Sequence, residues 1–113
     1  MSESDKIARG AAQALAGKFG PQLKLELEKQ IAAPGEAATQ TYAVAEAVSI
    51  ATFLLSVAKF GYDIYKDQRD RKAVDMDVIR RETRLKVKAP RGLSAEKRDA
   101  IIDAIAKELE MEE

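Results

Sequence analysis

An uncharged run in the middle of the chain constrains the fold more than any other feature. No charged residue lies between Glu46 and Lys59, and this run sits inside a longer stretch, Thr41 to Lys72, whose ends are sharp changes in composition. At 100° per residue, its apolar side chains fall on two neighbouring lines of a helix. The first line is Val44, Val48, Ala51, Leu55, Ala58 and Tyr62, and the second is Ala47, Ile50, Leu54, Val57, Gly61 and Ile64. Apolar side chains thus cover more than half of the circumference, which predicts a buried central helix.

The remaining arc of this helix is a polar stripe that faces solvent, a partner helix or lipid headgroups. It consists of Glu46, Ser49, Thr52, Ser56, Lys59 and Asp63. From the apolar arc we select six residues as the core or assembly surface of the helix: Val48, Leu54, Leu55, Val57, Phe60 and Tyr62.

A membrane-inserted central helix is the main alternative. A spanning helix needs roughly 20 apolar residues, and the uncharged run covers only Ala47 to Ala58. However, the flanking charges can extend to the interface, and a basic flank of Lys66, Arg69, Arg71 and Lys72 would remain at the cytoplasmic surface if residues 42–65 inserted. The polar stripe argues against lipid contact unless another helix covers it.

The segments on either side of the central helix give conflicting signals. Leu23, Leu25 and Leu27 alternate with charged residues as in a half-buried strand. Leu23, Leu27 and Ile31 also share one helix face, and the segment is rich in good helix formers, so residues 23–31 stay open between strand and helix. A second alternation covers residues 84–89, with lysine and arginine on one side. Because acidic and basic outer faces pair favourably across strands, we predict that the two segments form a two-stranded ribbon.

The expected fold is therefore α+β and mostly helical, in the order helix, strand, long central helix, strand, helix, with an all-α bundle as the alternative. Ser4 or Asp5 begins a first helix that ends near Lys18, and Ser94 caps the last helix. A break is expected near residues 73–77. The 113 residues fit a single domain with a frayed tail at 108–113.

The chain lacks the usual catalytic side chains. It has no histidine and no cysteine, which removes the common general bases, the thiol nucleophile and thiolate metal sites. Tyr62 and Lys66 have the Tyr-x-x-x-Lys spacing of short-chain dehydrogenases, but this resemblance is confined to two residues and the fold of those enzymes is far longer. Asp67, Asp70, Asp75 and Asp77 are interleaved with cations and lack the glycine of a calcium-binding loop. We expect no enzyme activity, no metal and no cofactor.

Charge is segregated although its sum is zero. Residues 66–91 carry ten basic and five acidic side chains, whereas residues 92–113 carry three basic and seven acidic ones. The two ends are complementary, and we favour two solvated faces over pairing between them. The clearest candidate surface is a basic run of six residues, Arg80, Arg81, Arg84, Lys86, Lys88 and Arg91.

These observations indicate a small, non-enzymatic interaction or assembly module. We expect it to self-associate, as a homo-oligomer, or to dock on a protein partner through apolar helix surface, with the basic run tuning the contact. A nucleic-acid binder that uses residues 80–91 is a further alternative, disfavoured because no aromatic residue interleaves the cations. The first residues lack the basic start and apolar run of a signal peptide, so we expect the cytoplasm or, alternatively, the inner face of a membrane.

Overall fold

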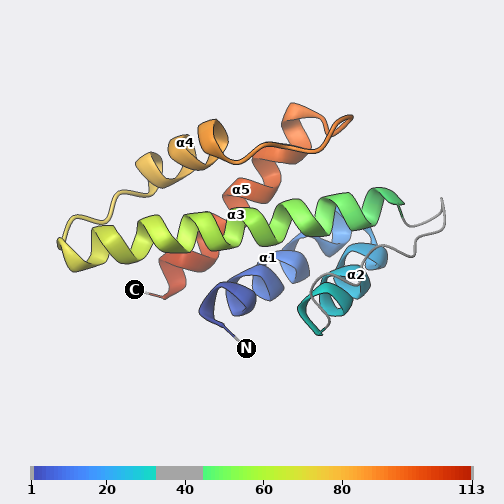
Figure 1. The fold of residues 1–113 in the computed structure, drawn as a ribbon, viewed down its shortest axis with the longest axis horizontal. Helices are drawn as coiled ribbons and strands as arrows, with labels where there is room; N and C mark the ends of the chain where they lie inside the picture. Colours follow the sequence, from blue (N-terminus) through green and yellow to red (C-terminus); the bar gives the residue numbers. More distant parts are fainter. Residues whose placement is uncertain (1, 33–44, 113) are drawn as a thin grey trace.

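Helices account for all the regular structure in the described part of the chain, residues 2–32 and 45–112 of a computed structural model (Figure 1). Their bounds are α1 Glu3–Phe19, α2 Pro21–Ala32, α3 Ala45–Asp70, α4 Met76–Lys86 and α5 Ala95–Met111. The predicted α+β fold with a two-stranded ribbon is therefore wrong, and the described residues form the all-helical alternative.

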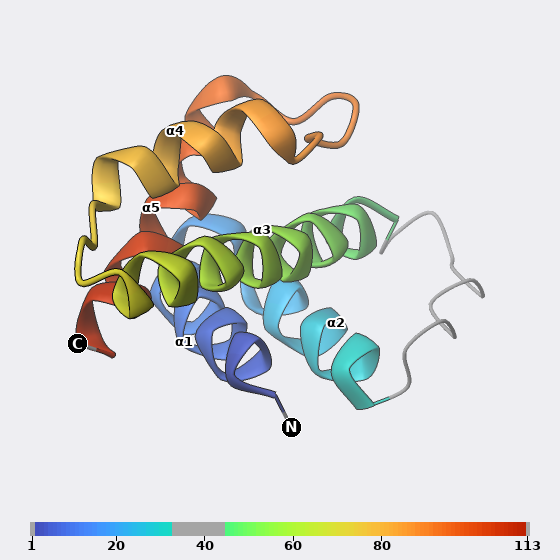
Figure 2. The same cartoon turned by 60° about the vertical axis from the view of Figure 1, so that its left-hand side comes forward.

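Helix α3 lies at the centre of the arrangement. It packs against each of the other four helices, with α1 and α2 along one side, α4 along the opposite side and α5 behind it (Figures 1 and 2). Its buried face includes Phe53, Leu54, Val57 and Tyr65, none of which is more than 3% exposed. The predicted central helix is thus confirmed over the described residues, while Thr41 to Val44 lie outside them.

Five of the six residues of the predicted polar stripe lie on the outer side of α3, and the side chain of the sixth, Glu46, lies outside what the structure describes. Ser49, Thr52, Ser56, Lys59 and Asp63 are all exposed. The helix ends at Asp70, and α4 begins at Met76 after a turn in which Lys72 has a positive φ of 57°. The break expected near residues 73–77 therefore begins a few residues earlier.

Helices α1 and α2 form a corner at Gly20. The φ of Gly20 is 82°, a value that glycine adopts without strain, and Pro21 begins α2 at the position where its missing N–H costs no hydrogen bond. Ser2, rather than Ser4 or Asp5, caps α1 in a capping box with Asp5. Across the corner, the guanidinium of Arg9 binds the carboxylate of Glu28 with two parallel contacts, which fixes the two helices side by side.

The segment predicted as the first strand is helix α2. Leu23 and Leu27, four residues apart, are fully buried, whereas Leu25, which the alternation places beside them, is 58% exposed. Glu26, assigned to the outer face of the ribbon, is only 4% exposed. Helix propensity therefore determined the structure here, and the alternation of three leucines was coincidental.

The segment predicted as the second strand is divided between two conformations. Residues up to Lys86 belong to α4, so Leu85 is turned outward and 71% exposed. Val87 has extended backbone angles, no described residue pairs with this segment as a strand, and Val87 and Ala89 pack against the core. The alternation of apolar and basic residues predicted for 84–89 thus holds only in the connection between α4 and α5.

Helix α5 begins at the predicted cap, because the hydroxyl of Ser94 accepts a hydrogen bond from the backbone N–H of Lys97. Its apolar face, with Ile101, Ile105 and Leu109 at 1% exposure or less, is buried against α1 and α3. Gly61 of α3 faces α4 and α5 at this interface, where a Cβ added at its position would lie 3.5 to 3.8 Å from the side chains of Leu109, Ile105 and Ile79.

Candidate functional site

A groove runs along the outer edge of α3, between its polar stripe and the chain that leaves α4. It consists of two adjoining hollows of about 290 and 430 Å³ that share Ser56 and Lys88. The first is lined by Val48, Ser49, Thr52, Phe53, Ser56, Lys88 and Pro90. The second is lined by Ser56, Lys59, Phe60, Asp63, Lys86, Val87 and Lys88. We call the two together the α3 groove.

The α3 groove combines apolar surface with a basic rim. Phe60, Val87 and Pro90 are half-buried and leave part of their apolar surface open. Lys59, Lys86 and Lys88 are exposed and form no ion pair with any residue that the structure describes. The one carboxylate in the lining, Asp63, lies 3.9 Å from the ammonium of Lys66. The groove is therefore positively charged.

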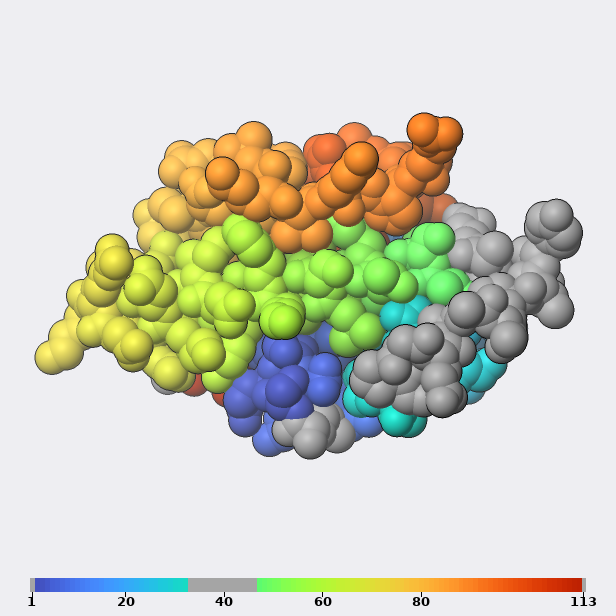
Figure 3. All heavy atoms as spheres, in the orientation of Figure 1, coloured from blue at the N-terminus to red at the C-terminus, as the bar shows by residue number. Residues whose placement is uncertain are grey.

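The local conformation after α4 orients Lys88. The end of α4 is marked by Val87, whose N–H donates to the carbonyl oxygen of Thr83 while its own φ and ψ are extended. Successive side chains of an extended segment point to opposite sides. Because Val87 and Ala89 pack on the core, Lys88 is left outside, at the rim. Figure 3 shows α4 and this segment lying along one edge of α3, with α1 and α2 along the other.

The predicted basic run is only partly available to a partner. Arg80 binds Asp103 of α5 at 3.2 Å, and Arg84 binds Asp99 of α5 at 3.1 Å. The complementary charges of the two segments thus pair within the chain, which is the alternative that the sequence analysis disfavoured. In the described part of the chain Arg81, Lys86, Lys88 and Arg91 have no such partner, and only Lys86 and Lys88 line the groove.

The six residues selected on the central helix divide into two groups. Leu54 and Val57 are fully buried beneath the other helices. Val48, Leu55, Phe60 and Tyr62 are half-buried, and of these Val48 and Phe60 line the groove. Large apolar side chains that are clearly exposed are few and scattered among the described residues: Leu25, Leu85 and Met111.

Sequence reasoning missed the groove as a unit. Lys59 and Ser56 were assigned to the polar stripe of the central helix, and Val87 to the second strand. A helix wheel gave the correct face for Lys59 and Ser56, but no local pattern indicates that residues 86–90 return to lie beside them.

The other motifs have local structural roles. The ammonium of Lys66 lies 5.0 Å from the ring centre of Tyr62, a cation–π contact within one helix turn. Asp75 caps α4 by accepting hydrogen bonds from the N–H groups of Asp77 and Val78. Asp67 lies 3.5 Å from Arg71. Among the described residues, no cluster of three acidic side chains is close enough to hold a metal ion.

One described helix is long and apolar enough to cross a membrane by length and composition. It covers Ala47–Asp70, and its most apolar window has a mean hydropathy of 1.4, with 39% of that window buried inside the protein. A core helix of a soluble protein passes the same test, so this observation is weak evidence for insertion.

Comparison of the chain with protein-family models, curated proteins and solved structures finds no match. The function is therefore inferred from the geometry of the α3 groove.

Proposed function

We propose that the protein is a non-enzymatic docking module that binds an acidic, amphipathic helix of a partner protein in the α3 groove. The observation that carries the proposal is the combination of open apolar surface at Phe60 and Val87 with three lysines that form no ion pair with any described residue. The proposal places the module in the cytoplasm, as expected from the sequence.

The charge of the groove selects the class of partner. Lys59, Lys86 and Lys88 surround a lining with one carboxylate, and that carboxylate has its own cation, Lys66. Rim charges of this kind accelerate association with an oppositely charged partner and exclude basic ones. An acidic partner therefore fits the groove, whereas a basic or neutral partner would not neutralise the positive charge of the lysines.

The dimensions of the groove select the shape of the partner. From Val48 to Asp63 the groove follows α3 for about 22 Å, at 1.5 Å per residue. A helix of about four turns has the same length. Helix-in-groove recognition places apolar residues at i, i+3, i+4 and i+7 against the floor, and acidic residues beside that stripe reach the lysines at the rim.

Fluorescence anisotropy with labelled peptides of about fifteen residues tests the proposal. The first peptide has leucines at i, i+3, i+4 and i+7 with glutamates beside them. A second replaces each glutamate by lysine, and a third keeps the composition but disperses the leucines around the helix. We expect only the first peptide to bind, with an affinity that falls as the salt concentration rises.

Matched variants separate the groove from general electrostatic attraction. Lys86→Glu with Lys88→Glu should weaken binding of the acidic peptide at least tenfold and allow the basic peptide to bind. Lys24→Glu with Lys107→Glu makes the same change in net charge at exposed sites outside the groove and should change affinity less than twofold. Equal weakening by both variants would contradict the proposal.

A second measurement tests whether the groove holds a second copy of the chain or a nucleic acid instead of a partner helix. Light scattering behind a sizing column, without detergent, should give the mass of a monomer. A dimer that dissociates on Lys86→Glu with Lys88→Glu would make a second copy of the chain the occupant, as the expected self-association requires. Binding of a DNA or RNA duplex that is lost in the same variant would favour the nucleic-acid alternative.

Membrane insertion is the second candidate function, and the apolar composition of α3 is the observation that favours it. Insertion would expose to lipid the fully buried face of Leu54 and Val57, and would require α3 to separate from α1, α2 and α5. Flotation with lipid vesicles that resists high salt would support this candidate. Recovery of the chain at the bottom of the gradient would support the docking module.

A further inference from the structure

The outer side of α4 and the segment that follows it carry positive charge beyond the α3 groove. Residues 81–91 include five basic residues and one acidic residue, Glu82. Figures 1 and 2 show α4 on the side of α3 opposite α1 and α2, at the outside of the molecule. Four cations of this segment are exposed and form no ion pair with any described residue: Arg81, Lys86, Lys88 and Arg91. We call these four residues, together with Leu85, the α4 surface.

An exposed leucine lies among these cations. Ile79 and Thr83, four residues apart, are buried and mark the inner face of α4. At 100° per residue, Arg81 and Leu85 lie together on the opposite, outward face. Leu85 is 71% exposed, so its apolar surface leaves water only when another surface covers it.

A tight turn presents the last cation of the α4 surface. The N–H of Leu93 donates to the carbonyl oxygen of Pro90 at 3.2 Å, and Gly92, the third residue of the turn, has a φ of 89° that glycine adopts without strain. Arg91 is the second residue of this turn and is exposed. The chain therefore extends the basic surface beyond the end of α4.

Two carboxylates of α4 reduce this charge without cancelling it. Glu82 is half-buried. Asp77 lies in the first turn of α4, at the end of the helix remote from Arg91, and is 3.5 Å from Arg80. The α4 surface thus remains strongly positive.

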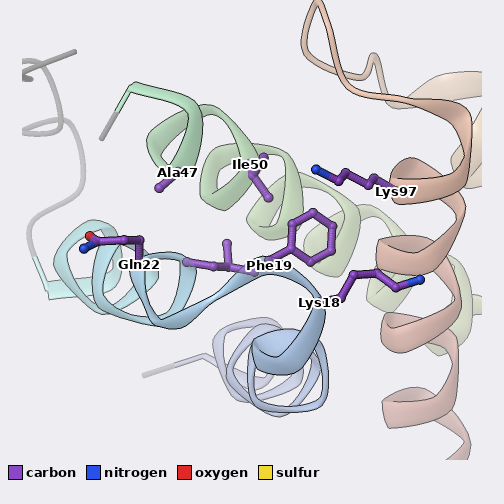
Figure 4. A pocket seen from close by; sticks show the side chains of 7 residues that line it. Lys18, Phe19, Gln22, Ala47, Ile50 and Lys97 are labelled. Atoms are coloured by element: carbon purple, nitrogen blue, oxygen red, sulfur yellow. The ribbon is translucent and has the colours of Figure 1, made fainter. Parts of the chain in front are cut away.

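The cations at the corner of α1 and α2 differ, because they have contacts within the chain. The ammonium of Lys18 lies 4.0 Å from the carboxylate of Glu96, and Lys97 is half-buried with its ammonium 5.7 Å from the ring centre of Phe19 (Figure 4). The α4 surface offers a ligand several cations without such contacts, and it is therefore the better candidate for binding an anionic surface.

We propose that the α4 surface binds the face of an anionic lipid bilayer. Its cations lie at the charged headgroups, and Leu85 lies at the boundary between headgroups and acyl chains. Each lysine or arginine near such a bilayer strengthens binding by about fivefold. Four of them support a reversible association in which the helices stay packed, unlike insertion of α3. The proposal does not rest on docking in the α3 groove, because Arg81, Leu85 and Arg91 lie outside its lining.

The exposed leucine favours a lipid surface over a nucleic acid. Nucleic-acid phosphates attract the cations equally well, but they offer Leu85 no apolar contact. Stacking on unpaired bases requires aromatic side chains, and residues 76–93 contain none. A protein partner needs a surface of complementary shape, whereas the headgroups of a bilayer move laterally and can gather at the cations of an outer surface.

Flotation of the full chain with lipid vesicles tests the proposal. Vesicles of phosphatidylcholine with phosphatidylserine should bind it at least tenfold more tightly than phosphatidylcholine alone, and high salt should release it by screening. Arg81→Gln with Arg91→Gln removes two charges outside the α3 groove and should weaken binding at least tenfold. Lys6→Gln with Lys24→Gln, at exposed sites of α1 and α2, is the matched control and should change binding less than twofold.

A fluorescent residue tests the position of the contact. The chain has no tryptophan, so one introduced tryptophan is the sole indole probe. The emission of Leu85→Trp should shift to shorter wavelength with the anionic vesicles, whereas that of Leu25→Trp, at an exposed leucine of α2, should not. Leu85→Ala should weaken vesicle binding at least threefold, and Leu25→Ala should leave it within twofold.

The proposal is overturned if anionic and neutral vesicles bind equally, if the two pairs of glutamine substitutions weaken binding equally, or if Leu25→Trp shifts as much as Leu85→Trp. Vesicle binding that resists high salt would contradict it in favour of an inserted α3. A DNA duplex that binds more tightly than the anionic vesicles, and whose binding is unaffected by Leu85→Ala, would make the α4 surface a nucleic-acid site instead.

Discussion

The side chain of Gln30 in α2 is hydrogen-bonded to Thr52 in α3. The Gln30 carboxamide oxygen accepts from the Thr52 hydroxyl at 3.1 Å, and its NH₂ group donates to the carbonyl oxygen of Val48 at 3.2 Å. Gln30 is only 9% exposed, so this amide is a buried polar group with both of its ends satisfied by α3. The contact fixes α2 against the first turns of α3, beside the α3 groove.

We predict that Gln30→Ala lowers the free energy of unfolding by about 1–3 kcal/mol, because it removes both hydrogen bonds from a buried site. Gln13→Ala, on the exposed side of α1, is the control and should change stability by less than about 0.5 kcal/mol. Urea denaturation followed by circular dichroism measures both. Equal midpoints for the two variants would show that α2 does not pack on α3 through Gln30.

Two adjacent leucines of α3 should differ strongly in their contribution to stability. Leu54 is 0% exposed, whereas Leu55 is half-buried. We predict that Leu54→Ala costs about 2–5 kcal/mol, because it leaves a cavity in the core. Leu55→Ala should cost clearly less, since part of its surface is already in water. Thermal melts of the two variants test the assignment, and the reverse order would place the wrong face of α3 in the core.

The ion pair between Arg84 and Asp99 should contribute little to stability despite its distance of 3.1 Å. The two side chains are 43% and 39% exposed, so solvent screens their attraction. A double-mutant cycle with Arg84→Ala and Asp99→Ala should give a coupling of about 0.2–1 kcal/mol that falls with salt. A coupling that persists at high salt would indicate that α4 and α5 bury this pair more deeply.

Glycine substitutions test how closely the helices approach. Gly17→Ala should stabilise α1 by about 0.5–1 kcal/mol, because the added methyl group meets no atom within 4 Å. At Gly61 the methyl group would make ordinary contacts of 3.5 Å or more with Leu109 and Ile105, so Gly61→Ala is also expected to be tolerated. Gly61→Leu should cost about 1–3 kcal/mol by overpacking. Denaturant midpoints for the three variants check this order.

Hydrophobic periodicity predicted those parts of the fold in which it agreed with local propensity. The central helix and its polar stripe follow from residue spacing, and the Ser94 cap of α5 follows from the preference of serine for the N-cap position. The two strands failed because a period of two over only three apolar residues also occurs by chance in a helix, as the exposure of Leu25 shows. In the segment around Val87 the alternation described an extended connection, which local sequence does not distinguish from a paired strand.

The candidate site was harder to predict than the helices. Lys59 and Lys88 lie far apart in the sequence and are brought to one groove by the turn between α3 and α4 and by the packing of Val87. The pairing of Arg80 and Arg84 with α5 likewise depends on how α4 and α5 pack. The basic run could therefore be found from sequence, but not which of its members form no ion pair with a described residue.

Hydrogen–deuterium exchange, with and without the acidic amphipathic peptide, tests the central claim most directly. The account predicts slower exchange of backbone amides in residues 48–63 and 86–90, with little change in α1 and the second half of α5. In the variant with Lys86→Glu and Lys88→Glu this protection should disappear while exchange of the free protein is unchanged. Protection centred elsewhere, for example on the exposed Leu25 of α2, would contradict the assignment of the α3 groove as the docking surface.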